Sequence, residues 1–232
     1  KKIDWIIVRE NSEGEYAGSG GIVHKGLPIE IGSEVAVFTR EGCRRIHDYA
    51  FKLASKRPKK HLTLITKSNA QKHGMKLWDK IFYEVKKYYP KVKTNKLLVD
   101  AATAVMVNNP EKIDVMVATN LHADILSDLA SALTGSLGIG ATANIATNKN
   151  FPSMFEPIHG SAFDIVGKNN ANPIGAIWSG MMMLEHLGEY KSANRIFKAI
   201  KLYANTGGPF TPDLGGTANT KKVINSILKL LV

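Results

Sequence analysis

Two aspartates stand four residues apart in the stretch NLHADILSD, residues 120–128. On a helix, Asp124 and Asp128 would share one face with their Cβ atoms roughly 5–6 Å apart, and carboxylates so close repel each other. A divalent cation such as Mg²⁺ or Mn²⁺ would suit both, because it takes oxygen ligands from protein, water and substrate. The alternative is a structural role in the first helical turn, which covers Asp124 but not Asp128. Apolar neighbours predict that this helix is buried: Ile125, Leu126 and Leu129.

Three further polar residues could do chemistry beside such a pair. Asp100 lies between a predicted strand and a predicted helix, Lys67 follows another predicted strand, and Tyr16 follows the acidic stretch RENSEGE. The carboxyl ends of strands are where open α/β folds place their ligands. Each residue also has an ordinary interpretation, respectively as a helix N-cap, a surface lysine and a strand aromatic. Spacing alone leaves both interpretations open.

The segment FEPIHGSAFDIVGKNNANP, residues 155–173, is predicted to be a long loop with small residues and two acids, Glu156 and Asp164. Small residues let backbone N–H groups approach a ligand closely. An acid here can accept hydrogen bonds from the ribose hydroxyls of NAD and would repel the extra phosphate of NADP. The G-I-G of residues 138–140 lacks the G-x-G-x-x-G pattern, so no Rossmann fingerprint is predicted.

The hydrophobic pattern predicts alternating strands and helices, the order of an α/β fold. Residues 14–38, rich in Gly and β-branched residues, predict an extended hairpin or arm. The glycine-rich break at 134–144 is the expected change of domain, so the domains are predicted at 1–134 and 135–232. The other expected strands lie at 3–8, 61–67, 91–99 and 113–120, and the expected helices lie at 39–57, 75–89, 100–110, 174–188 and 190–205, with one more at the C-terminus.

Composition favours a soluble globular protein, with 44% hydrophobic and 22% charged residues. No apolar run approaches the roughly 20 residues that cross a bilayer, so no membrane partner is expected. The single cysteine, Cys43, excludes an intramolecular disulfide and favours the reducing cytoplasm. The formal net charge is +11, but only residues 55–60 form a tight basic cluster, so no nucleic acid partner is expected. An enzyme with an anionic substrate and cofactor would also fit this charge.

Six motifs in order make the chain resemble the β-decarboxylating dehydrogenases, the family of isocitrate, isopropylmalate and tartrate or D-malate dehydrogenases. They are VRENSEGEY, TKSN, VDAATAVMVNNP, TNLHADILSD, FEPIHGSAFDIVGKNNANP and PDLGG. RENSEGEY is unlike isopropylmalate dehydrogenases, which tend towards RELTGG-Y, and residues 151–180 are most similar to the tartrate/D-malate branch. The resemblance implies an isopropylmalate/isocitrate dehydrogenase-like two-domain α/β fold, with the hairpin as a dimerisation arm and NAD bound by the second domain.

The same resemblance implies a metal site shared between two subunits. Asp124 and Asp128 match ligands of Mg²⁺ or Mn²⁺, and Asp100 of the partner subunit matches a third. The protein is therefore expected to be a homodimer with shared active sites.

Substrate roles also carry over by resemblance. Arg9 matches an arginine that binds the substrate carboxylate, which suits its planar fork of donors. Lys67 of the partner subunit matches the base that accepts the hydroxyl proton, and Tyr16 matches the acid that returns a proton after CO₂ leaves. All three are expected to contact the substrate.

The long loop matches the adenine-nucleotide site of the family. The residues that carry over are Glu156, His159, Gly160, Ser161, Ala162, Asp164 and Asn172. Asn69, in the TKSN motif, matches a residue near the nicotinamide. Asp164 followed by Ile165 is similar to NAD-type members, because NADP-type members place a lysine and a tyrosine there.

The resemblance implies NAD-dependent, metal-assisted oxidation and decarboxylation of a D-malate-type 2-hydroxy acid, tartrate or D-malate. The alternatives are a 3-isopropylmalate or isocitrate dehydrogenase and a non-catalytic regulatory subunit, which would be expected to lack metal or base residues. Two departures stand out: His122-Ala123 replaces an aromatic residue and glycine, and Phe163 replaces a proline. Family members carry roughly a hundred further N-terminal residues, including strands of the first domain. We therefore expect this chain to be a fragment that is inactive alone.

Overall fold

The computed structural model of the chain describes residues 3–148 and 150–231 and divides into two compact units. The first unit ends at Ala130 and the second begins at Ser131. This division falls near the end of a helix, slightly before the glycine-rich break in which the sequence placed the domain boundary. Each unit combines strands and helices, so the expected α/β class is confirmed.

A four-stranded parallel sheet forms the centre of the first unit. Every residue of β6 is buried, because this strand pairs with a neighbour on each side and has both faces covered. The short apolar runs of the sequence correspond to these strands within a few residues. In spatial order they are β1 (Ile6–Arg9), β6 (Val115–Ala118), β4 (His61–Thr66) and β5 (Lys93–Leu98).

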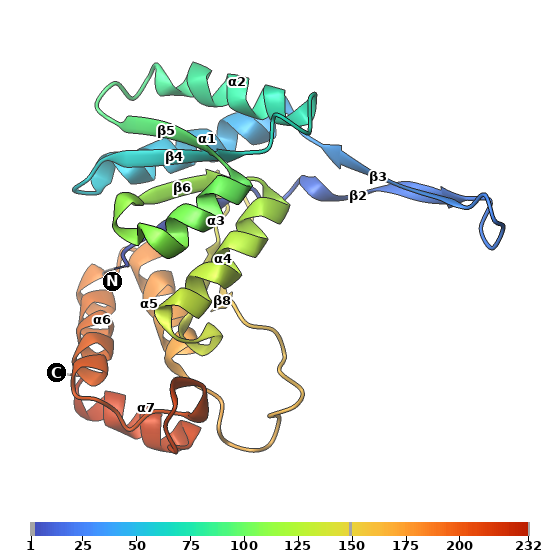
Figure 1. Cartoon of the computed structure of the whole chain (residues 1–232). Helices are drawn as coiled ribbons and strands as arrows, with labels where there is room; N and C mark the ends of the chain where they lie inside the picture. The colour runs from blue at the N-terminus through green and yellow to red at the C-terminus, as the bar shows by residue number, and fades with distance from the viewer. Residues whose placement is uncertain (1–2, 149, 232) are drawn as a thin grey trace. The chain divides into compact units, whose positions relative to one another are not determined.

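Four helices accompany this sheet: α1 (Arg40–Lys56), α2 (Gly74–Lys86), α3 (Val99–Asn108) and α4 (Asn120–Thr134) (Figure 1). Helix α1 begins after Thr39, whose side chain accepts a hydrogen bond from the Gly42 backbone N–H, and it ends before Pro58. Large buried side chains pack α1 and α2 together, among them Phe51, Trp78 and Phe82. This core fixes the sheet whose strand ends carry the predicted site.

A histidine buried in this core makes the stability of the protein pH-dependent. His47 is fully buried, and its Nε2 lies 3.1 Å from the Trp78 carbonyl oxygen. Burial lowers its pKa from 6.5 to about 3. Below pH 6.5 the unfolded chain therefore binds a proton that the folded chain excludes. We expect the free energy of unfolding to fall by roughly 1 kcal/mol from this residue alone between pH 7 and pH 5.5.

Urea unfolding at the two pH values measures this loss. The variant His47→Gln should show a weaker pH dependence over the same interval, whereas His24→Asn, at an exposed turn, should behave as the wild type does. An unchanged pH dependence in His47→Gln would show that another group is responsible.

The expected hairpin is formed by β2 (Gly14–Val23) and β3 (Ile31–Val37), which pair antiparallel and extend from the first unit in Figure 1. Most of its large apolar residues are more than half exposed, including Ile22, Ile29 and Ile31. Exposed apolar side chains on an extended hairpin are typical of a contact surface. The role of this hairpin as a dimerisation arm stays a prediction.

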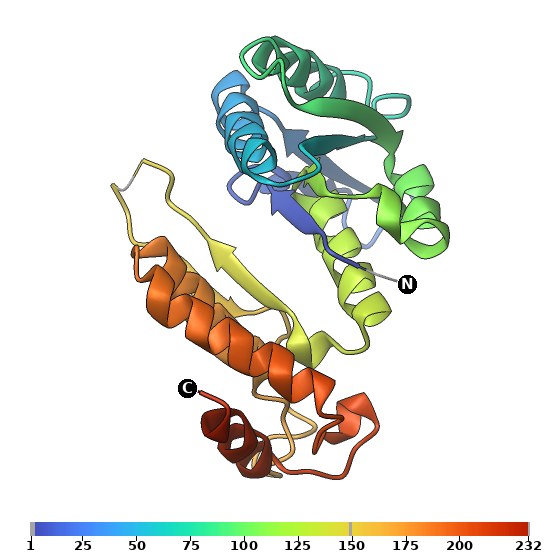
Figure 2. The same ribbon diagram turned by 90° about the vertical axis from the view of Figure 1, so that its left-hand side faces the viewer.

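The second unit packs α5 (Ile174–His186) against the two-stranded antiparallel sheet of β7 (Ala141–Asn144) and β8 (Met154–Pro157). Helices α6 (Tyr190–Asn205) and α7 (Thr220–Lys229) complete it, as Figure 2 shows. The sequence placed the start of the long loop at Phe155, which was wrong by three residues. Phe155–Pro157 belong to β8, so the loop runs from 158 to 173.

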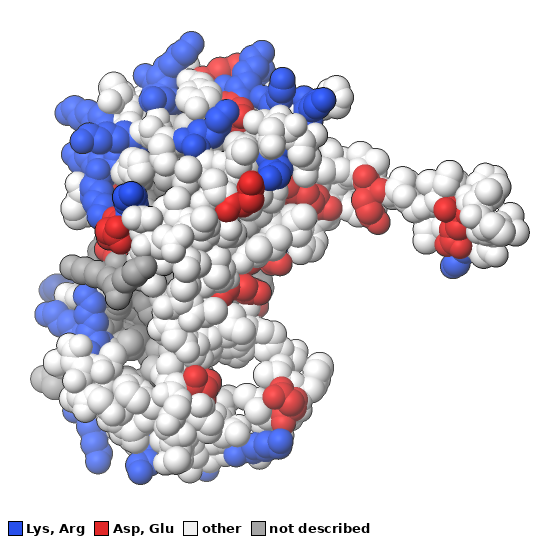
Figure 3. All heavy atoms as spheres, in the orientation of Figure 1, with Lys and Arg blue, Asp and Glu red and all other residues white. Residues whose placement is uncertain are grey.

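Charge is unevenly spread over the first unit. In Figure 3, Lys and Arg side chains gather over the part that contains α2, while acidic side chains lie on the side from which the hairpin projects. On the face that Figure 3 shows, basic and acidic side chains of this unit therefore gather over different parts of it. Across the described residues, no helix is both long enough and apolar enough to span a membrane.

Candidate functional site

The carboxyl edge of the parallel sheet collects most of the residues that the sequence singled out. Arg9 is the last residue of β1, Lys67 directly follows β4, and Asp100 lies in the first turn of α3, just after β5. Helix α4 begins two residues after β6 and carries the aspartate pair. Since parallel strands end at the same edge, one fold feature brings these side chains to one side of the unit.

Arg9, Tyr16 and Asp124 form a compact cluster at this edge. Arg9 Nη1 lies 2.5 Å from Asp124 Oδ1, and the Tyr16 hydroxyl donates to Asp124 Oδ2 over 3.2 Å. The Arg9 guanidinium also lies over the Tyr16 ring, 5.7 Å from its centroid. The negative charge of Asp124 raises the pKa of Tyr16, so the phenol keeps its proton at neutral pH. Arg9, the predicted carboxylate-binding residue, and Tyr16, the predicted acid, thus both contact Asp124.

Helix α4 starts too early for Asp124 to lie in its first turn, as the alternative, purely structural role of this residue required. Asn120 is its first residue, and no acidic residue lies in its first turn, so the N-terminal dipole does not account for Asp124. Asp128 is exposed on the same helix face and has no hydrogen bond or ion pair within the described parts of the chain. Ile125, expected to be buried, is 51% exposed, whereas Leu126 is buried. The face of α4 that carries the acids is open to ligands.

Lys67 and Asp100 form a second, separate pair. Lys67 Nζ donates to Asp100 Oδ1 over 2.6 Å, and this contact lowers the pKa of Asp100. The structural alternative for Asp100, a helix N-cap, is wrong: Leu98 is the N-cap of α3 and makes no side-chain cap. Asn69, two residues after Lys67, is exposed. The two residues predicted to come from the partner subunit therefore lie together.

The three predicted metal ligands do not meet within one chain. Among the described residues, no group of three His, Cys, Asp or Glu side chains is close enough to hold a metal ion. Asp124 and Asp128 nevertheless offer carboxylate oxygens on one half-exposed helix face, and that donor set fits Mg²⁺ or Mn²⁺. A third ligand from a second copy of the chain would complete such a site.

Three glutamates of the RENSEGEY motif fix the segment between Arg9 and Tyr16. Glu10 is buried and accepts hydrogen bonds from Ser12 and Arg45. Glu13 accepts from the backbone N–H and side chain of Thr39 at the start of α1. Glu15 accepts from Thr119 and from the Leu121 N–H at the start of α4. The sequence alone does not indicate roles for these acids; two of them, Glu13 and Glu15, bind at helix N-termini, where a carboxylate is favoured.

Asn120 is a residue of the site that sequence reasoning missed. It is buried, its Oδ1 accepts from Arg9 Nε over 2.9 Å, and its Nδ2 donates to the Glu13 carbonyl oxygen over 3.1 Å. It therefore orients the guanidinium. Because a buried hydrogen bond to a charged group contributes about 1.5–3 kcal/mol, Asn120→Ala should raise the KM for the hydroxy acid substrate that the family resemblance implies by about tenfold or more. Steady-state kinetics measure this, and the KM for NAD⁺ should not change.

The comparison variant for this prediction is Asn120→Asp, which keeps an acceptor for Arg9, loses the donor to Glu13 and adds a negative charge. It should bind the hydroxy acid better than Asn120→Ala does. Equal KM values for the two variants would contradict an orienting role for the amide oxygen.

His122, one of the departures from the family pattern, keeps the aromatic character of the residue that it replaces. It is 5% exposed, and its Nδ1 has no hydrogen-bond partner within the described residues. Burial lowers its pKa, Glu15 raises it and Lys67 lowers it. The net decrease keeps the imidazole neutral near pH 7, so it acts as a buried ring.

The predicted nucleotide-binding residues lie in the second unit, on β8 and the loop that follows it. Most are exposed: Glu156, His159, Gly160, Ser161, Ala162 and Asp164. Ala162 has a positive φ of 46°. Asn172 differs, since it is buried and both of its side-chain polar groups bind within the protein. The loop thus offers exposed backbone and side-chain groups along its length. Phe163, the other departure from the family, is 86% exposed.

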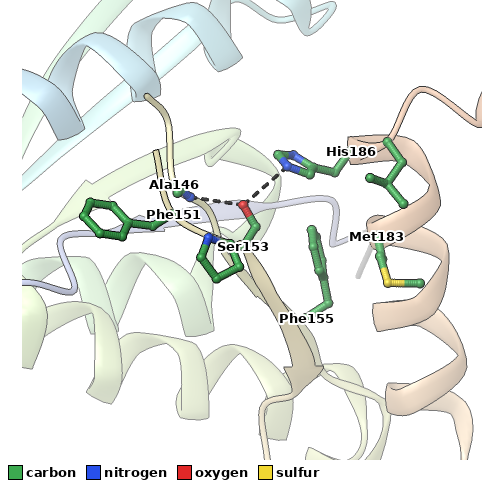
Figure 4. Close-up of a pocket in the computed structure, with 8 residues that line it drawn as sticks. Ala146, Phe151, Ser153, Phe155, Met183 and His186 are labelled. Carbon is green, nitrogen blue, oxygen red and sulfur yellow. Dashed lines mark hydrogen bonds between the residues drawn. The ribbon is translucent and has the colours of Figure 1, made fainter. Parts of the chain in front are cut away.

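A hollow of about 480 Å³ also lies in the second unit (Figure 4). Aromatic and apolar side chains line it, among them Phe155 and Met183, and Ser153 Oγ lies 3.3 Å from His186 Nε2. Its lining contains none of the predicted site residues. Among the described residues, neither Ser153 nor His186 has a hydrogen bond or ion pair with an acidic side chain, so the pair lacks the acid of a catalytic triad.

Comparisons with known proteins agree with this arrangement. The chain is 58% identical over 229 residues to a probable tartrate dehydrogenase/decarboxylase of Agrobacterium vitis, which covers 99% of this chain and 64% of that protein. It is 46% identical over 235 residues to the decarboxylating D-malate dehydrogenase of Escherichia coli, covering 99% and 65%. The crystal structure of isocitrate dehydrogenase from Methylococcus capsulatus superposes with a TM-score of 0.91 at 41% identity, covering 97% and 66%.

The chain thus spans about 64% of the length of the tartrate dehydrogenase relatives, and the predicted similarity to the tartrate/D-malate branch is confirmed. The fold is that of the isocitrate dehydrogenase structures. Residues 1–227, nearly the whole chain, match the isocitrate/isopropylmalate dehydrogenase family, and the chain belongs to this family.

Proposed function

We propose that the protein is an NAD-dependent, divalent-metal-assisted dehydrogenase that oxidises and decarboxylates a D-malate-type 2-hydroxy acid, tartrate or D-malate. The observation that carries this proposal is the cluster of Arg9, Tyr16 and Asp124 at the carboxyl edge of the sheet. Relatives named as tartrate and D-malate dehydrogenases support the substrate class. When bound, Mg²⁺ or Mn²⁺ would supply Lewis acidity at the substrate oxygens, and NAD⁺ would accept the hydride.

The side chains of the site have complementary tasks in this reaction. Arg9 binds a substrate carboxylate through its guanidinium fork, which Asn120 orients. Lys67 takes the proton of the substrate hydroxyl during oxidation. Tyr16, whose pKa the nearby Asp124 raises, returns a proton to the carbon that loses CO₂. Asp124 and Asp128 would hold the metal ion with Asp100 of the partner subunit.

The separation of the site into two groups supports a homodimer with shared active sites. Arg9, Tyr16 and Asp124 are in mutual contact, whereas Lys67 and Asp100 contact each other. No three-ligand metal group forms among the described residues of one chain. Two copies would bring one group of each kind to every active site.

NADH formation by the full-length gene product tests the proposal. D-malate, tartrate, 3-isopropylmalate and isocitrate would each be assayed with Mn²⁺ and with a chelator. A Mn²⁺-dependent rate on D-malate or tartrate is expected. Preference for isopropylmalate or isocitrate would contradict the substrate assignment, and a folded dimer with no rate on any acid would favour a regulatory subunit. We also propose a cytoplasmic location, which the single cysteine favours and which cell fractionation would test.

A further inference from the structure

The PDLGG motif, residues 212–216, has no role in the catalytic cluster, yet its aspartate contacts the predicted nucleotide loop. Asp213 Oδ2 accepts hydrogen bonds from Ser136 Oγ over 2.5 Å and from Asn172 Nδ2 over 2.9 Å. Burial raises the pKa of Asp213, but hydrogen bonds, among them those from Ser136 and Asn172, outweigh burial, so the pKa lies below its usual value and the carboxylate stays charged. One oxygen of Asp213 therefore joins two separate segments of the second unit.

Both polar atoms of the Asn172 side chain already bind within the protein. Its Oδ1 accepts from the Ile174 backbone N–H over 3.0 Å, at the start of α5, while its Nδ2 donates to Asp213. Asn172 is only 8% exposed. Asn172 thus fastens the end of the loop to α5 and to Asp213, and its value to a nucleotide lies in where it holds the loop.

Neighbouring contacts show that this junction is closely packed. A Cβ atom on Gly138 would lie 2.8 Å from Asn172 Cβ and 2.9 Å from Asp213 Oδ2. Thr220 adds two hydrogen bonds to the loop end, from its N–H to the Asn169 carbonyl oxygen and from its hydroxyl to that of Ala171. The segment from Asp213 to Thr220 is therefore the main support of the loop near its C-terminal end.

The glycines of the motif let this support turn back. Gly215 has a φ of 76°, in the left-handed region, and a Cβ on Gly216 would clash with the Phe210 carbonyl oxygen. The turn closes with a hydrogen bond from the Ala218 N–H to that same carbonyl oxygen over 2.8 Å. The two glycines of PDLGG thus allow the turn that directly follows Asp213.

We propose that Asp213 is a positioning residue for the nucleotide: through Asn172 it holds the loop over residues 158–173 in its binding conformation. This inference rests on the proposed NAD site in that loop. The C-terminal end of the loop is held by Asp213 and Thr220. The exposed middle of the loop is held mainly by local hydrogen bonds, from the N–H groups of Ile165 and Lys168. Loss of the Asp213 charge should therefore loosen the loop and weaken nucleotide binding.

The test compares Asp213→Asn with the exchanged pair Asn172→Asp/Asp213→Asn. In the single variant two amides face each other without the charged acceptor, and we expect the Kd for NADH to rise about fivefold to tenfold. In the exchanged pair the new amide can donate to the new carboxylate, which can still accept from the Ile174 N–H, so the Kd should return towards the wild-type value. Glu185→Gln, an exposed acid of α5, is the matched control.

Hydrogen exchange of the loop separates positioning from nucleotide binding. Amides of residues 158–172 should exchange faster in Asp213→Asn than in the wild type without any nucleotide, and the exchanged pair should restore slow exchange. Unchanged loop exchange and unchanged Kd in Asp213→Asn would overturn the inference. A loosened loop in a protein that never binds NADH would uphold the positioning role and contradict the NAD proposal instead. In the full-length enzyme, Asp213→Asn should raise the KM for NAD⁺ and leave kcat unchanged.

Discussion

Replacing Lys67 with methionine should lower kcat by roughly 10²–10⁴-fold, the usual contribution of a general base. Methionine keeps an unbranched stem of similar length and removes the group that takes the hydroxyl proton. The Lys67 side chain is 28% exposed and contacts Asp100 at the surface of the sheet edge, so its loss should not unfold the protein. Steady-state kinetics with D-malate or tartrate would measure kcat, and circular dichroism would check the fold.

The matched control is Lys96→Met, because Lys96 is a similarly exposed lysine of the same unit. Its Nζ lies 3.3 Å from Asp79, so this variant also breaks a lysine–aspartate pair. We expect its kcat to stay within about twofold of the wild type, since surface ion pairs contribute little. Comparable losses in both variants would mean that Lys67 matters through charge or stability, and proton transfer would have to be assigned elsewhere.

Much of the first unit could be predicted from the sequence because its signals are local. Apolar runs such as residues 113–118 become buried strands, and Thr39 and Pro58 bound α1 as their chemistry requires. The hairpin over 14–38 follows from a segment rich in glycine and β-branched residues. These features depend on neighbours within a few positions, which a single sequence displays directly.

The supporting residues of the site could not be predicted, because their partners lie far away in sequence. Asn120 contacts Arg9 across more than a hundred positions, and Glu15 reaches the start of α4 from the hairpin. Asp213 and Asn172 are likewise joined only by the fold. Nothing local distinguishes such residues from ordinary surface polar groups, and the PDLGG motif was therefore a marker without a function.

The wrong expectation for Ile125 has a related cause. Helical periodicity identifies an apolar stripe but does not show whether another element covers every part of it. Ile125 lies beside Asp124 on the chain and is half exposed, so the acidic part of α4 remains accessible. The prediction that Asp124 lies in the first helical turn was also wrong, because α4 already begins at Asn120. This start is held by contacts with Glu13 and Glu15, which are distant in sequence.

Mixing two inactive variants should restore about a quarter of the wild-type activity if active sites are shared between subunits. A Lys67→Met chain lacks the base, and an Asp124→Asn chain lacks a metal-binding carboxylate. In a mixed dimer, one site would take the intact Asp124 of the first chain and the intact Lys67 of the second, whereas the other site would carry both lesions. Half of randomly assembled dimers would be mixed, each with one working site of two.

The control mixture combines Lys67→Met with Asp100→Asn, whose side chains lie 2.6 Å apart in one chain. Because Lys67 and Asp100 would both be supplied to a site by the same subunit, every site of such a mixed dimer carries one lesion. Activity should therefore stay near zero. The variants would be unfolded together, refolded and assayed for NADH formation. Recovery in the first mixture alone would establish that each site draws on two chains. Mass spectrometry would verify that mixed dimers form. No recovery in either mixture would then mean that Lys67 and Asp124 of a single chain act in the same site and approach each other when substrate binds.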